Sequence, residues 1–382
     1  MALTNSDIVE LTDWRRMLHQ MPELSGHEEG TARAVVAMLA DQHPDQIITG
    51  LGGHGVAAVF DGAAPGPTVL FRCELDALPI HEISDLPYRS RTDGVGHMCG
   101  HDGHSTIMAG FARLIARQRP ARGRVVLLFQ PAEEIGSGAA AVLADPRFGA
   151  IAPDWAFSLH NMPGLPFAHV SLAEGPVNCA SRGLKVHLTG KTSHASVPEA
   201  GVSPALCLTE LIPTLLALGP GGAVVPGFRL VTITHARLGG AAFGVTPGDA
   251  ELWVMLRVLL DADMAAMVAE AEACVQALAA THGLGLDMSY HDIFAACYND
   301  PAATGHLSRA IKAEGLGIGT QDLPMRGSED FGLFGARSRS AMFFLGAGEH
   351  YPMIHNPDYD FPDGLIGPGV RVFHRVLRDL LG

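Results

Sequence analysis

Hydrophobic residues recur at helical and strand spacing along most of the chain. The clearest helical pattern covers residues 102–118, where apolar side chains form one stripe. This stripe consists of Ile107, Met108, Phe111, Leu114 and Ile115. Short apolar runs bounded by turn residues predict buried strands at residues 55–60, 68–71, 124–129, 155–159 and 341–345. Because such strands alternate with helical segments, we predict an α/β layer with a mostly parallel sheet.

The pattern changes near residue 180. Leu184, Val186 and Leu188 alternate with polar residues, which predicts a half-exposed strand. Helices are then predicted at 204–218 and 262–281, with further strands at 228–238, 250–260 and 284–290. This β-α-β-β-α-β order is typical of a ferredoxin-like unit. We therefore predict that residues 1–180 and 296–382 form one domain, into which residues 181–295 are inserted as a ferredoxin-like α+β domain.

Composition narrows the choice of partners. The chain has 382 residues, of which 47% are hydrophobic and 17% charged, as in ordinary globular enzymes. A net charge of −14 without a basic block argues against nucleic acid or an anionic membrane as the partner. We find no export-signal pattern and no apolar run of bilayer length, and the six cysteines are scattered. These features predict a cytoplasmic protein, but the acidic net charge says little about a small substrate, because a local site can still be positive.

Candidate chemistry is densest in the stretch His97–His104, which reads HMCGHDGH. Cys99 and His101 stand two positions apart, so both side chains can point to one side of a turn. A thiolate, imidazoles and a carboxylate together suit a divalent cation of borderline softness. The same residues are also typical of a buried cysteine followed by capping histidine and aspartate residues at the start of a helix. This stretch alone leaves both interpretations open.

Further polar residues follow the predicted strands. Glu133 and Glu134 come directly after one strand, His160 follows another, and His355 lies in a loop beyond a third. Ligands gather at the carboxyl ends of strands in open α/β sheets. Taken singly, two glutamates can also begin a helix, and His160 can be a buried core residue. Together with the thiol and imidazole described above, these groups suit two ions that share a bridging ligand.

Seven short motifs extend over nearly the whole chain. They are Arg16–Leu24 (RMLHQMPEL), Asp76–Pro79 (DALP), Cys99–His104 (CGHDGH), Gln130–Glu134 (QPAEE), Gly190–Ala195 (GKTSHA), Ser328–Phe331 (SEDF) and His355–Pro357 (HNP). As a set they resemble the M20-type metallo-amidohydrolases. The subgroup that they resemble includes hippurate hydrolases, N-acyl-amino-acid amidohydrolases and auxin-conjugate hydrolases.

The resemblance implies a role for each matching residue. Glu133 corresponds to the general base, and Asp76 to an aspartate that orients the site. His194 corresponds to a histidine that reaches the partner subunit's active site and polarises the scissile carbonyl, which also makes it a substrate contact. Arg257 and Gly244 stand at the positions of further substrate contacts. The implied metal ligands are Cys99, His101, Glu134, His160 and His355.

The implied assembly is a homodimer, or a higher oligomer, formed through the inserted domain. Each subunit is expected to hold two divalent ions of zinc, manganese, cobalt or nickel. Three positions depart from the family pattern: Glu74 and Gly248 replace aspartates, and Gly244 replaces an asparagine. We expect metal-dependent hydrolysis of the amide bond of N-acyl amino acids. The alternatives are a dipeptidase or exopeptidase of the same family, or a metal-bound protein that binds a small molecule without catalysis.

Overall fold

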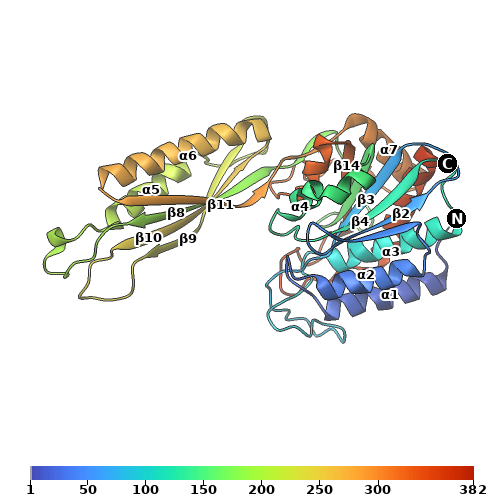
Figure 1. Ribbon diagram of the computed structural model, residues 1–382, viewed down its shortest axis with the longest axis horizontal. Coiled ribbons are helices and arrows are strands. Elements are labelled where there is room, and N and C mark those ends of the chain that lie inside the picture. The colour runs from blue at the N-terminus through green and yellow to red at the C-terminus, as the bar shows by residue number, and fades with distance from the viewer. Residues whose placement is uncertain (1) are drawn as a thin grey trace. The chain divides into compact units, whose positions relative to one another are not determined.

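Two groups of segments pack separately in the computed structural model, which describes residues 2–382 (Figure 1). The first unit consists of Met1–Val177, Cys297–Leu323 and Asp330–Gly382. The second unit consists of Asn178–Ala296 and Pro324–Glu329. The two main boundaries therefore lie close to residues 180 and 296, where the sequence pattern changes. The short segment Pro324–Glu329 packs with the second unit, which sequence periodicity did not indicate.

The first unit is built on an eight-stranded sheet with the order β1-β2-β4-β3-β5-β14-β6-β13. Its strands are β1 (Gln46–Leu51), β2 (Gly55–Asp61), β3 (Thr68–Glu74), β4 (Arg124–Gln130), β5 (Trp155–Pro163), β6 (Val170–Ser171), β13 (Ile318–Gly319) and β14 (Arg339–Gly348). A separate two-stranded sheet pairs β7 (Gly175–Asn178) with β12 (Cys297–Asn299). The central strands β4, β3, β5 and β14 are parallel, whereas β1 and β2 pair antiparallel at one edge. The carboxyl ends of the central strands therefore meet along one edge of the sheet.

Helices cover this sheet. They are α1 (Asn5–Gln20), α2 (Glu29–Ala40), α3 (His101–Arg117), α4 (Gly138–Ala144), α7 (Pro301–Ala313) and α8 (Ile366–Leu381). Short 3-10 helices are formed by Pro146–Ile151, Asp330–Ala336 and Asp363–Leu365. The apolar stripe of α3 is completely buried, as predicted, and packs with α8 and β3. This packing holds the first turn of α3 at the carboxyl edge of the sheet.

Aromatic side chains fill the contact between α3, α8 and the sheet. The ring of Phe71 on β3 lies 4.7 Å from that of Phe111 on α3 and 5.0 Å from that of Phe373 on α8. All three side chains are buried. Burial of a phenylalanine side chain contributes about 1.5–3 kcal/mol, so this cluster is a major part of the core that supports the site.

His374 on α8 makes the stability of this core depend on pH. The residue is 8% exposed, and its Nε2 accepts a hydrogen bond from Arg378 Nε at 3.2 Å. Burial, followed by the charges of Arg378 and Arg375, lowers the pKa of His374 from its ordinary 6.5 to about 4. The unfolded chain therefore binds this proton more readily, and stability falls as the pH drops from 6.5 towards 4.

Substitution of His374 by glutamine is expected to weaken this pH dependence. Between neutral pH and about pH 4.5, the variant should lose about 2 kcal/mol less unfolding free energy than the wild type does. Urea unfolding curves measured at several pH values provide the comparison. Parallel pH profiles for the two proteins would show that His374 titrates normally in the folded state.

The second unit has the predicted β-α-β-β-α-β order. Its elements are β8 (Ala180–Thr189), α5 (Ala205–Ala217), β9 (Arg229–Leu238), β10 (Asp249–Val258), α6 (Asp261–Thr281) and β11 (Gly285–Phe294), with a 3-10 turn at Pro198–Ala200. The strands form an antiparallel sheet in the order β11-β8-β10-β9. Helices α5 and α6 lie on one side of this sheet (Figure 1). As expected from the alternating pattern, Leu184, Val186 and Leu188 are buried beneath them.

Helix α6 is the one element whose length and apolar composition would allow it to cross a membrane, within the residues described. This differs from the expectation that no apolar run has such a length. In the structure, Met267, Ala271 and Val275 of α6 are fully buried in the core of the second unit. Packing of this face against the sheet accounts for the apolar character of the helix.

Candidate metal centre

The first turn of α3 brings Cys99 and His101 to the carboxyl edge of the large sheet. Gly100 between them has φ +90°, a left-handed conformation that favours glycine. A Cβ atom at Gly100 would lie 2.1 Å from Oδ1 of Asn161, so a larger residue would have to displace the Asn161 side chain. The glycine therefore allows the thiol and the imidazole to approach the end of the neighbouring strand.

His101 is oriented by the backbone and points into a group of carboxylates. Its Nδ1 lies 2.9 Å from the carbonyl oxygen of Asp76, so Nδ1 carries the proton and donates it. Its Nε2 is buried and has no hydrogen-bond partner among the described residues. Carboxylate oxygens of Glu133 and Glu134 lie 3.9 Å and 3.8 Å from Nε2. Burial lowers the pKa of His101, but the hydrogen bond with Asp76 and the charges of Glu74 and Glu134 outweigh it and raise this pKa to about 10, so the ring holds a second proton in the absence of a cation. A cation between Nε2 and the two carboxylates would replace that proton.

The two glutamates extend from the loop that follows β4. Ala132 in this loop has φ +50°, which is strained for a residue with a Cβ atom. The backbone N–H of Glu134 donates to Oδ2 of Asp76 at 3.0 Å, and Oδ2 also accepts from Ser25 Oγ at 2.6 Å. Asp76 therefore contacts the loop directly and also presents its carbonyl to His101. The orienting role that the family resemblance implies for Asp76 stays a prediction, which would act through these contacts.

The other two candidate ligands complete the cluster. Nε2 of His160, on β5, lies 3.3 Å from Sγ of Cys99. Nε2 of His355 lies 3.6 Å from Oε2 of Glu134. Possible ligand atoms lie within 4.8 Å of one another in the groups Cys99–His101–His160, Cys99–Glu134–His355 and His101–Glu133–Glu134. The structure thus brings together all five residues predicted as ligands, with the predicted general base beside them, in one unit of the fold.

The electrostatics of this cluster favour a bound cation. Burial raises the pKa of the Cys99 thiol well above its ordinary value, and the carboxylates of Glu134 and Glu133 add to this effect. Burial also lowers the pKa of His160, which keeps its imidazole neutral. A cation would stabilise the thiolate and release its proton, and neutral imidazoles are the form that binds metals. The donor set of thiolate, imidazole and carboxylate fits zinc and its neighbours in the first transition series.

A buried ion cluster on α1 supports the start of α3. Arg15 Nη1 donates to Asp102 Oδ2 at 3.1 Å and to Asp360 Oδ1 at 2.6 Å. Nδ1 of His19 lies 2.9 Å from the same Oδ2 of Asp102. The side chains of Arg15, His19 and Asp102 are completely buried. Because Asp102 follows His101 directly, this cluster fixes the turn that carries the metal-ligating side chains.

Glu74, one of the departures from the family pattern, belongs to a second buried ion cluster. It pairs with Arg72, and its Oε2 lies 2.6 Å from Nδ1 of His104. Arg72 also donates to Oδ1 of Asp330 at 2.6 Å. Burial would raise the pKa of Glu74, but Arg72 and His104 hold it well below its usual range. This role of Arg72 was not predicted from the sequence, although an arginine within an apolar strand indicates a buried ion pair.

The predicted substrate contacts lie in the second unit. Nδ1 of the exposed His194 accepts the backbone N–H of Ser196 at 3.1 Å, so the neutral ring carries its proton on Nε2. Arg257 Nη1 donates to the carbonyl oxygen of Arg326 at 2.5 Å and to Ser328 Oγ at 2.6 Å. No described carboxylate lies within ion-pair distance of Arg257. Both side chains thus retain hydrogen-bond donors that a substrate could use.

The structure accounts for one of the two glycine departures in this unit. A Cβ atom at Gly248 would lie 2.8 Å from the backbone nitrogen of Thr192, so the larger aspartate would not fit without a backbone shift. Gly244 is exposed, and a Cβ atom there would meet nothing within 4 Å. Its carbonyl oxygen accepts the N–H of Ala195 at 3.0 Å, next to His194. Nothing in the structure explains why asparagine is absent at Gly244.

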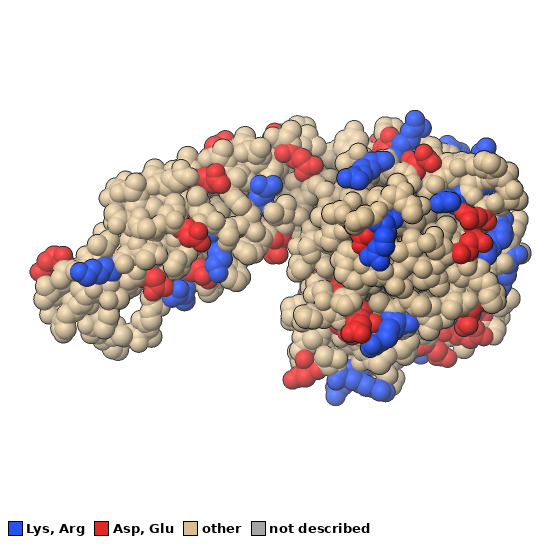
Figure 2. All heavy atoms as spheres, in the orientation of Figure 1, with Lys and Arg blue, Asp and Glu red and all other residues tan. Residues whose placement is uncertain are grey.

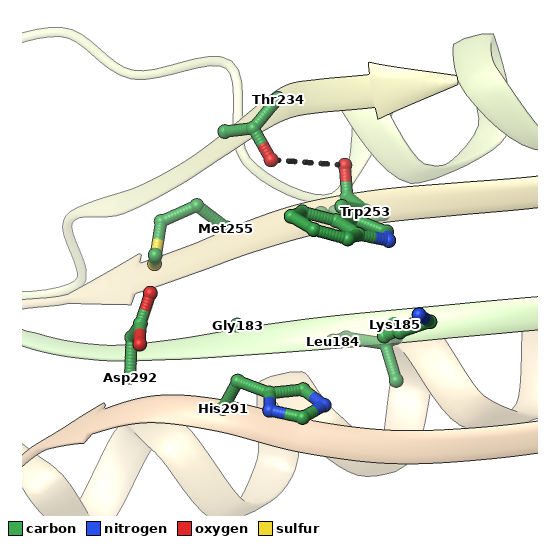
Figure 3. Close-up of a pocket in the computed structure, with 9 residues that line it drawn as sticks. Gly183, Leu184, Lys185, Thr234, Trp253, Met255, His291 and Asp292 are labelled. Atoms are coloured by element: carbon green, nitrogen blue, oxygen red, sulfur yellow. Dashed lines mark hydrogen bonds between the residues drawn. The ribbon is translucent and has the colours of Figure 1, made fainter. Parts of the chain in front are cut away.

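A cavity of about 340 Å³ lies on the open face of the sheet in the second unit (Figure 3). Lys185, Trp253, Met255, His291 and Asp292 contribute to its walls. Thr234 Oγ1 donates to the carbonyl oxygen of Trp253 at 3.4 Å beside it. None of these residues belongs to a group of potential metal ligands among the described residues. This cavity therefore shares no residue with the candidate metal centre.

Acidic and basic side chains are interspersed on the surface shown in Figure 2, particularly over the first unit. Many of them form exposed pairs, for example Arg33 with Glu29 at 3.0 Å. Such pairs contribute little to stability and do not create a strong local field. The charged groups of the candidate metal centre are instead buried at the carboxyl edge of the sheet.

Comparison with known proteins agrees with this geometry. The chain is 31% identical to the N-acetyl-L-cysteine deacetylase of Bacillus subtilis (strain 168), over 89% of this chain and 81% of that protein. It is 29% identical to the hippurate hydrolase of Campylobacter jejuni, over 95% and 94% of the two chains. A crystal structure of a dinuclear metal-binding M20 peptidase from Bacillus subtilis superposes with a TM-score of 0.82 and 25% identity, covering 99% of both chains.

The family assignment follows from a match over most of the sequence. Residues 70–379 match the description of peptidase family M20/M25/M40, a range that includes every candidate metal ligand. The resemblance found in the sequence motifs is thereby confirmed, as is the mixed α/β architecture. The chain belongs to peptidase family M20/M25/M40 and is a metal-dependent hydrolase of amides.

Proposed function

We propose that the chain hydrolyses the amide bond of N-acyl amino acids, with two divalent cations bound at the cluster of Cys99, His101, Glu134, His160 and His355. The observation that carries this proposal is the position of Glu133. Its carboxylate lies 3.9 Å from His101 Nε2, next to the candidate ligands and in the same loop as Glu134. A carboxylate beside a metal centre can move a proton without itself being required as a ligand.

Cations held by these residues would supply Lewis acidity and would lower the pKa of a water molecule. Glu133 accepts the proton of the attacking water while the water oxygen bonds to the carbonyl carbon. Glu133 then delivers a proton to the amide nitrogen as the carbon–nitrogen bond breaks. The products are a carboxylic acid and a free amine, so atoms and charges balance. The buried surroundings of Glu133, which is 6% exposed, strengthen its interactions with the reacting groups.

The proposal assigns substrate recognition to the second unit. The Nε2–H of His194 is a donor for the carbonyl oxygen, acting from a second copy of the chain in a homodimer. Arg257 is a donor for the carboxylate of the amino acid, since guanidinium groups bind carboxylates in a bidentate manner. Support comes from the tautomer that Ser196 imposes on His194 and from the absence of a described carboxylate beside Arg257.

A substrate panel tests the proposal. The purified protein is loaded separately with zinc, manganese, cobalt or nickel and offered N-acetyl amino acids, N-benzoyl amino acids and dipeptides. We expect kcat/KM for the best N-acyl amino acid to exceed that for the best dipeptide at least about tenfold. A preference for dipeptides would replace the proposal with an exopeptidase. Tight binding without hydrolysis for every metal would instead support a non-catalytic binding protein.

A further inference from the structure

Glu28 is a buried carboxylate whose contacts are unusual for its place in the fold. It is the residue immediately before α2, and its side chain is completely buried. A residue at this position ordinarily uses its side chain to accept an N–H from the first turn of its own helix. Glu28 makes no such bond. Its side chain is therefore available for another contact.

The backbone N–H groups in the first turn of α2 donate to a different residue. Glu23 accepts the backbone N–H groups of Gly30 at 3.0 Å and Thr31 at 2.7 Å, and also the hydroxyl of Thr31 at 2.8 Å. These are the donors that a capping side chain at Glu28 would have satisfied. The N-terminus of α2 is thus capped by Glu23 and not by Glu28.

Glu28 instead binds the loop that carries the proposed general base. Its Oε1 accepts the backbone N–H of Ala132 at 2.8 Å and that of Gly26 at 2.8 Å. Ala132 is the residue with φ +50°, directly before Glu133. A backbone in this conformation is held only where its surroundings determine it strongly. The hydrogen bond from Glu28 is one such determinant.

A second carboxylate holds the loop on the other side of Glu133. Asp76 Oδ2 accepts the N–H of Glu134 at 3.0 Å. The loop is further closed by the N–H of Gly136, which donates to the carbonyl oxygen of Glu133 at 2.8 Å. The residues on both sides of Glu133 are therefore bound by carboxylates that lie outside the loop. Only one of these, Asp76, was expected from the sequence.

We infer that Glu28 is a positioning residue for the proposed hydrolysis, holding Ala132 in its left-handed conformation and thereby fixing Glu133 relative to the metal ligands. The hydrogen bonds of Glu28 described above come from backbone N–H groups, so it acts through the backbone. The inference rests on the proposed role of Glu133. Misplacement of a reacting group by about 1 Å can lower a rate on the order of 100-fold, so loss of this contact is expected to be visible in kcat.

The hydrogen bond from Ala132 requires an acceptor oxygen at the right distance, but it does not require that the acceptor be charged. Burial raises the pKa of Glu28, and the backbone bonds only partly oppose this effect. A glutamine has the same length and retains the acceptor oxygen, whereas an aspartate retains the charge but draws the oxygen back by about one bond length. The two variants therefore separate geometry from charge.

The test compares E28Q, E28D and E28A with the wild type, and uses E29A as the matched control at the neighbouring exposed position. We expect E28A to lower kcat about 10–100-fold, with KM and bound metal unchanged. E28Q should stay within about threefold of the wild type and should exceed E28D. E29A should behave as the wild type, because exposed pairs such as that of Glu29 with Arg33 contribute little.

A second readout needs neither substrate nor metal. In the metal-free protein, amide hydrogen exchange of residues 131–138 should be faster in E28A and E28D than in the wild type, and unchanged in E28Q. Wild-type kcat in E28A, or a loss of kcat that follows loss of bound metal, would overturn the inference. Equal impairment of E28Q and E28A would do the same. The substrate panel on the wild type decides the proposed function separately.

Discussion

Replacing Glu133 by glutamine should lower kcat by a factor of about 10²–10⁴, the range associated with general acid–base catalysis. Glutamine fills the same space but cannot accept a proton from water. The cation-binding groups stay in place, because His101, Glu134 and the other candidate ligands are unchanged. We therefore expect metal content and KM to be close to those of the wild type while kcat falls.

The measurement combines steady-state kinetics on the best substrate with metal analysis of the same preparations. E134Q provides the informative comparison, since Glu134 lies 3.8 Å from His101 Nε2 and 3.6 Å from His355 Nε2. That variant should lose bound metal as well as activity. An active E133Q enzyme would show that another group takes the proton. A metal-free E133Q enzyme would show that Glu133 is a ligand.

Removal of metal by a chelator should abolish hydrolysis and reduce stability. Without a cation, the carboxylates and imidazoles of the cluster lose the charge that would bind them together, and the thiol of Cys99 keeps its proton. At a free metal concentration of about 1,000 times Kd, binding contributes about 4 kcal/mol to the free energy of unfolding. The metal-free protein should therefore unfold at lower temperature, and activity should return on addition of a suitable divalent ion.

Calorimetry and activity assays on chelator-treated and reloaded protein test this expectation. Reloading with each transition metal separately also identifies which ions support catalysis. Magnesium is the control, because it prefers oxygen ligands and does not match a site with a thiolate and imidazoles. Undiminished activity in protein shown to be free of metal would contradict the account.

Much of the fold was accessible from periodicity. The helix expected at 102–118 is α3, and the ferredoxin-like order of the second unit was read from alternating strands and two amphipathic helices. The sequence did not reveal β1, which contains polar and glycine residues, or the two-residue strands β6 and β13. Such strands form because neighbouring strands offer partners, and a one-dimensional pattern does not contain this information.

The candidate site could be predicted from the sequence only in part. Placement of polar residues at strand ends indicated a ligand-binding edge and its five candidate ligands, whereas the roles of Asp76, His194 and Arg257 depended on the family resemblance. Glu28 shows why. It precedes the exposed Glu29, and nothing in their identities distinguishes the buried carboxylate from the solvated one. Only the arrangement of α2 against the loop after β4 shows that Glu28 contacts Ala132.

The proposed hydrolysis requires that loops distant in the sequence hold a pair of cations beside Glu133. A crystal structure of the metal-loaded protein, with anomalous scattering recorded at the absorption edge of the metal, tests it most directly. We expect two peaks about 3.5–4 Å apart, bordered by Cys99, His101, Glu134, His160 and His355. Fully loaded crystals with no peak among these residues, or with metal bound elsewhere, would contradict it.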